Sequence, residues 1–235
     1  MLKDLIYWEL MLIFIQNCMM NFIVANKILK IRQKNYRGFV FSKVGDLFNN
    51  FYKNHIPFEP TNAQKKVLKE IRKDFKSGQH MNRLLQGDVG SGKTVVAVSA
   101  MLAAVQGRHQ GALMAPTEVL AEQHFVGVRK LLEGISVPDE NNLFGDRQLR
   151  VELLTSRITS DRRRELLRDL ANGGVDILIG THALIQEGVE FASLGVVVID
   201  EQHRFGVEQR AALRNKGSKA TDAGSDSKVV NSPDV

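Results

Sequence analysis

Hydrophobic residues in the middle of the chain form short apolar runs that alternate with longer segments of helical spacing. Short apolar runs bounded by turn residues predict buried strands, and apolar residues three or four positions apart predict amphipathic helices. The expected strands are 83–85, 111–114, 151–154, 175–179 and 196–199, and the expected helices are 61–76, 94–105, 118–132 and 161–170. Alternating strands and helices favour an α/β fold, in which a parallel sheet is covered by helices and binds its ligand at the carboxyl ends of the strands.

The chain divides into three parts by pattern. Residues 1 to about 35 predict one long helix or two shorter ones, and the pattern then loosens through Gly and Pro residues up to residue 60. We therefore expect an N-terminal helical segment over 1–56, a core domain over 57–217 and a polar tail over 218–235.

Residues 10–25 are the one stretch that could be mistaken for a membrane anchor. The run is shorter than the roughly 20 apolar residues that a spanning helix needs, and Gln16, Asn17 and Asn21 interrupt it. No small-residue cleavage site follows it, as a secretory signal would require. A packed amphipathic helix is the favoured interpretation, and no membrane partner is expected.

The stretch 87–94 fits G-x-x-x-x-G-K-[ST], the pattern of a loop whose backbone N–H groups surround nucleotide phosphates. Lys93 places a positive charge on the outer phosphates, and Thr94 supplies a hydroxyl for Mg²⁺. A strand before the loop and a helix after it would put the phosphates at a helix N-terminus. The expected nucleotide-binding residues of the loop are Gly87, Asp88, Val89, Gly90, Ser91, Gly92, Lys93 and Thr94.

Asp200 and Glu201 follow the last predicted strand. Hydrolysis of a nucleoside triphosphate needs one carboxylate to hold Mg²⁺ and a second to orient the attacking water. Such a pair alone is more often a solvated turn, but a phosphate loop in the same chain changes its meaning. We assign Asp200 to Mg²⁺ and Glu201, with Lys93, to catalysis.

Composition narrows the class of protein. The chain is 43% hydrophobic and 25% charged, which is typical of a globular protein. Its net charge is +6, and residues 27–83 hold 14 Lys and Arg against 4 Asp and Glu. This local basic excess suits a phosphate backbone, although solvated helix faces explain it equally well. The single cysteine, Cys18, fits a reducing cytoplasm and offers no zinc cluster.

Four long motifs carry a resemblance to a known family. Residues 87–94, 114–124, 180–186 and 200–210 together resemble the RecG family of ATP-dependent DNA helicases, and the match runs over about 57–217. The resemblance implies a RecA-like P-loop NTPase domain that uses ATP and Mg²⁺. It also implies that the N-terminal helical segment is the linker before the motor.

A second family competes for the same motifs. The transcription-repair coupling factor shares part of the phosphate loop, but it typically has Phe in place of Ser91 and Glu in place of Gln202. Both positions favour the RecG resemblance, and the coupling factor stays as an alternative.

The resemblance assigns further roles. It implies that Gln64 reads the adenine edge, with an ordinary surface helix residue as the alternative. It also implies that Gln202 and His203 couple the nucleotide site to DNA, with a structural hydrogen bond as the alternative for His203. Exposed charges are the preferred interpretation of Arg162 to Arg164. The residues implied to contact the DNA backbone, for which helix capping is the alternative, are Thr117, Thr155, Ser156 and Thr181.

Two parts of such a motor have no counterpart in the sequence. A helicase of this type needs a second RecA-like domain that supplies an arginine finger, and a wedge domain that binds the junction. The chain is therefore interpreted as the linker and first motor domain, expected to be monomeric. We expect the parent protein to couple ATP hydrolysis to movement along duplex DNA, remodelling replication forks and Holliday junctions in recombination and repair. The rival hypothesis is a module that binds ATP and DNA without productive hydrolysis.

Overall fold

The structure is a computed structural model that describes residues 46–56, 58–77, 81, 83–88, 90–138 and 145–201. The helices expected in the first 35 residues, the apolar run 10–25 and the polar tail lie outside the described residues. Val89, Gln202 and His203 lie outside them as well. Within the described part of the chain, no helix is long and apolar enough to cross a membrane.

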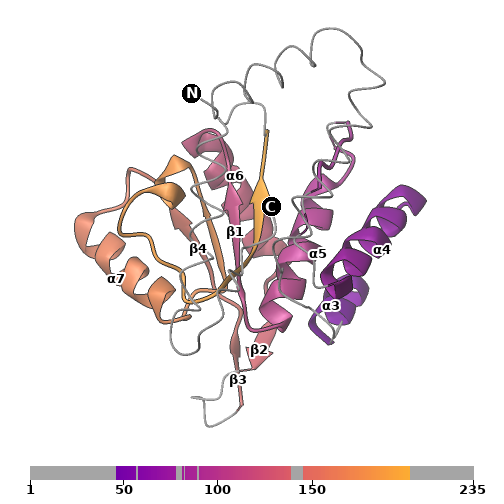
Figure 1. The fold of residues 1–235 in the computed structure, drawn as a ribbon, viewed down its shortest axis with the longest axis horizontal. Coiled ribbons are helices and arrows are strands. Elements are labelled where there is room, and N and C mark those ends of the chain that lie inside the picture. Colours follow the sequence, from indigo (N-terminus) through magenta and orange to yellow (C-terminus); the bar gives the residue numbers. More distant parts are fainter. Residues whose placement is uncertain are drawn as a thin grey trace, which may run out of the picture.

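A four-stranded parallel sheet forms the centre of the fold (Figure 1). Its strand order is β4-β5-β1-β6, so that β1 lies between β5 and β6. In register, Leu113 of β1 pairs with Ile179 of β5 and with Val198 of β6. Four of the predicted strands are thereby confirmed, with bounds β1 Gln110–Met114, β4 Val151–Leu154, β5 Ile177–Gly180 and β6 Leu194–Ile199.

Helices cover both faces of this sheet. Because successive strand residues point to opposite faces, neighbours in one strand pack in different apolar clusters. Leu113 packs in one cluster with residues of α5 (Lys93–Gln106) and α6 (Glu118–Leu131). Its neighbours Ala112 and Met114 pack in the other cluster, with α7 (Ser160–Ala171) and the 3₁₀-helix η2 (His182–Ile185). The sheet is therefore buried between two apolar layers, as its nearly continuous hydrophobic strands require.

The N-terminal elements of the described chain pack beside α5. They are α3 (Asp46–Asn50), the π-helical turn η1 (Phe51–His55) and α4 (Asn62–Ser77). Phe51 is fully buried, and the backbone N–H of Leu47 donates to Gln106 Oε1 at 3.1 Å. These residues of the predicted linker thus share the hydrophobic core of the motor domain, and the boundary near residue 57 stays a prediction.

The strand expected at residues 83–85 is wrong. The described structure pairs no strand there, and Leu84 is 67% exposed. The Arg83 guanidinium donates to Glu70 at 2.8 Å and to Asp74, both on α4. These ion pairs hold the segment against α4, and only Leu85 packs on the core.

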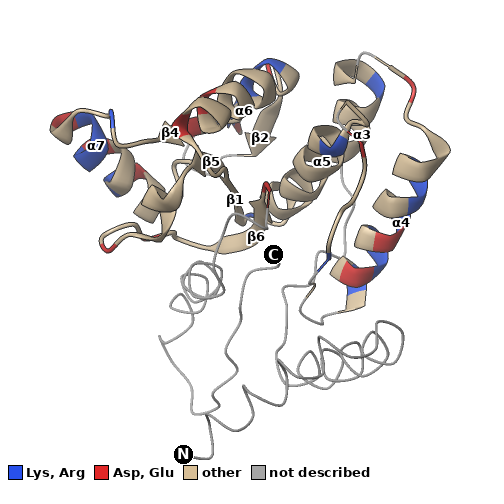
Figure 2. Ribbon diagram, turned by 90° about the horizontal axis from the view of Figure 1, so that it is seen from above, with Lys and Arg blue, Asp and Glu red and all other residues tan. Residues whose placement is uncertain are grey.

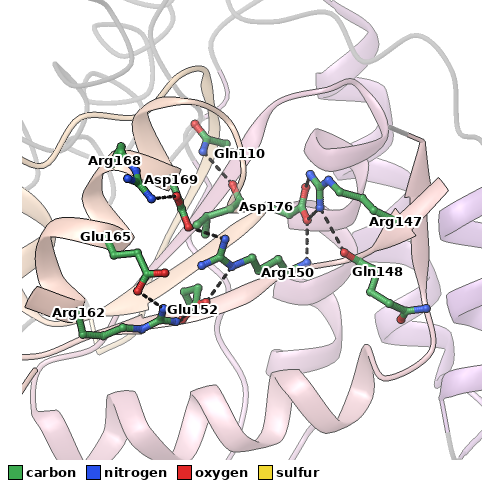
Figure 3. Close-up of polar contacts among 11 residues, drawn as sticks. Gln110, Arg147, Gln148, Arg150, Glu152, Arg162, Glu165, Arg168, Asp169 and Asp176 are labelled. Carbon is green, nitrogen blue, oxygen red and sulfur yellow. Dashed lines mark hydrogen bonds and ion pairs between the residues drawn. The ribbon is translucent and has the colours of Figure 1, made fainter. Parts of the chain in front are cut away.

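A short antiparallel hairpin was not predicted. It consists of β2 (Ser136–Pro138) and β3 (Asp146–Gln148), and three residues per strand leave no periodicity to detect. Arg147 of β3 donates to both carboxylate oxygens of Asp176, at 2.6 and 2.8 Å (Figure 3). The same carboxylate accepts from the backbone N–H of Arg150 at 2.7 Å. This bidentate pair fastens the hairpin to the amino end of β5.

The start of α7 also differs from expectation. Ser160 was expected to cap this helix, but it is the first helical residue, and Thr159 takes the cap position without a side-chain hydrogen bond. Next to α7, Arg150 bridges Asp169 of the helix and Glu152 of β4, each at 2.8 Å (Figure 3). These ion pairs add to the apolar packing of Leu166 and Leu170, which holds the helix on the sheet.

Candidate active site

Glycines let the phosphate loop fold tightly onto the start of α5. Gly92 caps α5 in the left-handed region, at φ 79°, and Gly90 has φ 80°. A Cβ on Gly92 would lie 2.3 Å from Gln64 Nε2, closer than two such atoms can approach. At Gly92, therefore, the backbone angle favours glycine, and any side chain would displace the Gln64 amide.

Lys93 curls back over the loop. Its ammonium donates to the carbonyl oxygens of Gly87 at 2.7 Å and Asp88 at 2.8 Å. The Ser91 N–H donates to the Asp88 carbonyl at 3.1 Å and closes the turn. A compact positive charge is thereby held at a solvent-open, glycine-rich turn before a helix N-terminus, an arrangement that suits phosphate oxygens.

Gln64 connects α4 to this loop. Its Nε2 donates to the Ser91 carbonyl at 2.8 Å, and its Oε1 accepts from the Thr61 N–H at 2.9 Å. The Thr61 hydroxyl in turn accepts from the Gln64 N–H at 3.2 Å, which completes a reciprocal capping box. Gln64 is 8% exposed, so it is not an ordinary surface residue. The Thr-x-x-Gln spacing is a signal that could have revealed the box, but not the contact with the loop.

Asp200 and Glu201 follow directly after β6, as expected. The Asp200 N–H donates to the Met114 carbonyl at 2.9 Å, which extends the β1–β6 pairing by one residue. The Glu201 N–H donates to Asp200 Oδ1 at 3.0 Å, and Glu201 itself has φ 47°. The other oxygen, Asp200 Oδ2, accepts from His124 Nε2 of α6 at 2.8 Å. His124 was not predicted as a site residue.

The loop and the carboxylates lie at the same edge of the sheet. α5 ends at Gln106 and β1 begins at Gln110, so the last turn of α5 lies at the amino end of β1. Because α5 packs along β1 and β6, its first turn lies toward the carboxyl ends, where Asp200 follows β6 (Figure 1). The first turn supplies the half-buried hydroxyl of Thr94. A hydroxyl and a carboxylate at the same edge as an ammonium-bearing glycine loop fit Mg²⁺ and a triphosphate.

The residues implied to contact DNA follow β1, β4 and β5, and they divide into two kinds. Thr117 and Ser156 are exposed, whereas Thr155 and Thr181 are only 5% and 2% exposed. Thr117 caps α6 by accepting from the Leu120 N–H at 3.3 Å. Only the exposed pair presents hydroxyls at the surface of this edge, and the DNA-binding role of all four stays a prediction.

Ser156 is held in place by the first turn of α6. Its backbone N–H donates to Glu118 Oε1 at 2.9 Å, and its hydroxyl donates to the same oxygen. These hydrogen bonds from Ser156 lower the pKa of Glu118 below its ordinary value. The loop after β4 and the N-terminus of α6 thus form one polar unit.

Basic residues are spread over the outer helices (Figure 2). On α7, Arg162 contacts Glu152 and Glu165, and Arg164 contacts Asp161. These pairs agree with the preferred interpretation of that arginine run as exposed charges. On α4, six Lys and Arg residues outnumber the two acidic residues, Glu70 and Asp74 (Figure 2).

Comparison with known proteins identifies the family. The family model described as DEAD/DEAH box helicase matches residues 61–230. This match spans most of the chain. The chain belongs to the DEAD/DEAH box helicase family.

Individual relatives of this family are closely similar. The ATP-dependent DNA helicase RecG of Streptococcus pneumoniae is 56% identical over 162 residues, which cover 69% of this chain and 22% of the relative. RecG of Thermotoga maritima is 48% identical over 196 residues, which cover 83% of this chain and 23% of the relative. The chain therefore spans less than a quarter of the length of these relatives.

Solved structures agree with the fold. A structure of RecG bound to a three-way DNA junction superposes with a TM-score of 0.67 and 42% identity, covering 77% of this chain and 23% of that one. The UvsW helicase of bacteriophage T4 superposes with a TM-score of 0.51 at 14% identity, which shows the fold alone. The parallel sheet with flanking helices is thus a RecA-like helicase fold, as the motifs had implied.

Proposed function

We propose that this chain is the ATP-binding motor domain of a helicase that remodels branched DNA. The observation that carries the proposal is the phosphate loop, with the Lys93 ammonium held over it, at the same sheet edge as Asp200 and Glu201. The similarity to RecG helicases at 56% identity supports the choice of substrate. Recombination and repair of stalled forks in the cytoplasm is the corresponding cellular role.

Each side chain of the site has a chemical role in this proposal. Lys93 binds the outer phosphates, Thr94 and Asp200 hold Mg²⁺, and Glu201 orients the attacking water. Bound Mg²⁺ would neutralise charge that develops on the phosphates. The backbone amides of Gly87 to Thr94 surround the phosphates.

Gln64 retains the capacity to read adenine. One amide hydrogen and one oxygen lone pair serve Ser91 and Thr61, which leaves one donor and one acceptor position on the amide. Because the same amide is bonded to the loop, adenine contact and loop position would be linked.

DNA would bind at the carboxyl ends of the strands through the exposed hydroxyl of Thr117, and through Ser156 once its hydroxyl exchanges the Glu118 carboxylate for a phosphate oxygen. Buried Thr155 and Thr181 would act by shaping the loops that carry their backbone amides. Gln202 and His203, which follow Glu201, would connect this surface to the nucleotide site. Small hydroxyls and amides bind a DNA backbone without reading its sequence, which suits recognition of branched structure.

Nucleotide binding by the complete 235-residue chain tests the proposal. Titration with a fluorescent ATP analogue should give saturable binding that Lys93→Ala weakens at least tenfold, because the ammonium on the outer phosphates is lost. Lys66→Ala is the matched control, since it removes the same charge from an exposed position on α4. Equal affinity of the wild type and Lys93→Ala would refute the assigned site.

The rate of ATP hydrolysis distinguishes a helicase motor from a module that only binds ATP and DNA. An arginine finger contributes about 10³ to 10⁵ in rate, so a chain that relies on another domain for it should bind ATP but hydrolyse it very slowly. Addition of a three-way DNA junction should then raise turnover only in a polypeptide that includes the second motor domain. Fast hydrolysis by the 235-residue chain alone would contradict this division of the site.

A further inference from the structure

His124 makes a specific contact with the candidate metal carboxylate. It lies on α6, its side chain is 20% exposed, and its Nε2 is 2.8 Å from Asp200 Oδ2. A carboxylate oxygen accepts, so His124 carries a proton on Nε2 and donates it to this bond. The two residues are 76 positions apart in the sequence, and only the packing of α6 beside the sheet brings them together.

The carboxylate of Asp200 is held at both oxygens. His124 donates to Oδ2, while the backbone N–H of Glu201 donates to Oδ1 at 3.0 Å. The Asp200 backbone is fixed as well, through its N–H bond to Met114. A carboxylate has about four lone-pair positions, so two remain for a metal ion or its water, and the 32% exposed side chain leaves them accessible.

The helix that carries His124 is a rigid support. Ala121 and Val128 are fully buried against the sheet, and Thr117 caps the first turn. Glu118 in that turn binds Ser156 of the neighbouring loop. Because α6 is fastened at these points, the imidazole approaches Asp200 from a fixed direction. Partners of this kind orient metal ligands and are commonly worth 10- to 100-fold in metal affinity.

We propose that His124 is a positioning residue that orients the Asp200 carboxylate for the Mg²⁺ of a bound nucleotide. The inference rests on the proposed function, because it assumes that Asp200 holds that ion. This positioning role requires a hydrogen-bond donor where His124 Nε2 lies. Gln presents its amide nitrogen at about that reach, whereas Asn is one methylene shorter and leaves Oδ2 without the donor.

The experiment compares His124→Gln with His124→Asn in the complete chain. The measured quantity is the gain in affinity for a fluorescent ATP analogue between EDTA and saturating Mg²⁺. Direct binding of Mn²⁺ to the nucleotide complex, followed by electron paramagnetic resonance, gives a second readout.

The Asn variant should lose about tenfold of the Mg²⁺-dependent gain and keep its affinity in EDTA. The Gln variant should keep most of the gain. Val126→Ala, an exposed position on the same helix, should match the wild type.

A double-mutant cycle with Asp200→Asn makes the test specific. In that background, His124→Asn should cause no further loss, because the carboxylate that it orients is gone. Equal Mg²⁺ gains in the Asn variant and the wild type would overturn the role of His124 while leaving the proposed function intact. A wild-type chain that fails to bind the nucleotide at all would overturn both. If His124→Asn does not fold, a folded Gln variant without Mg²⁺ gain overturns the inference.

Discussion

Gly92 offers a sharp test of how the phosphate loop is built. Gly92→Ala adds one methyl group at φ 79°, where an L-residue is strained. The new Cβ would lie 2.3 Å from Gln64 Nε2, and that atom is the end of a flexible side chain. Gln64 would therefore move while the backbone stays in place. Its hydrogen bonds to Ser91 and Thr61 would be lost in the process.

The magnitude follows from these terms. The left-handed conformation costs a residue with a Cβ about 1–2 kcal/mol. Each hydrogen bond of Gln64 contributes about 1 kcal/mol, and two are broken. We expect Gly92→Ala to lower the free energy of unfolding by about 3–4 kcal/mol. Gly90 also has a left-handed φ, at 80°, but a Cβ added there would meet nothing within 4 Å, so Gly90→Ala should cost only the conformational term.

Urea denaturation of the complete chain measures both variants, and ATP binding shows whether the loop keeps its function. The excess of Gly92→Ala over Gly90→Ala, about 2 kcal/mol, is attributed to the two hydrogen bonds of Gln64. In a Gln64→Ala background this excess should vanish, because the displaced amide is already absent. Equal destabilisation by the two glycine variants, or an excess that persists without Gln64, would refute the reasoning.

Three other predictions concern the rest of the fold. Burial lowers the pKa of His109 below its ordinary 6.5, so the unfolded chain binds a proton that the folded chain does not. The free energy of unfolding should therefore fall as the pH is lowered through 6.5. In a series of denaturation curves at different pH, His109→Gln should reduce this dependence on pH. An unchanged dependence in the variant would exclude His109 as its cause. Arg147→Ala should lower the free energy of unfolding by about 1–3 kcal/mol, because it leaves the carboxylate of Asp176 without its bidentate partner. This loss is smaller than that expected for a fully buried ion pair, because the Arg147 side chain is 28% exposed. Arg164→Ala, which removes a fully exposed ion pair, is its control and should change stability by less than about 0.5 kcal/mol, and similar losses in both would contradict the structural role of the hairpin contact. Gln110, 5% exposed, bonds the carbonyls of two residues and one backbone N–H, so Gln110→Ala should cost about 2–4 kcal/mol in the same assay, and a loss under about 1 kcal/mol would count against it.

Local pattern was sufficient for most of the elements. The strand at 151–154 has the expected bounds, and α5 differs from its expected range by one residue at each end. Periodicity works for these segments because burial on one face or on both leaves a regular apolar spacing. It failed for 83–85, where an apolar-leaning run is held beside α4 by the ion pairs of Arg83. Apolar spacing reports that a segment can be buried, but it does not report which partner covers it.

The position of the glycine-rich loop before α5, and that of Asp200 and Glu201 after β6, were predictable from sequence alone, because each is a run of consecutive residues at the end of a helix or a strand. Tertiary structure decided everything that joins distant segments. It brought Gln64 to the Ser91 carbonyl and His124 to Asp200. It also buried the side chains of Thr155 and Thr181, which were expected to contact the DNA backbone at the surface. The physical reason is that a hydrogen bond depends on where two segments meet in space. The order of strands in the sheet and the packing of helices on it determine where two segments meet. The apolar spacing within a segment predicts neither of these.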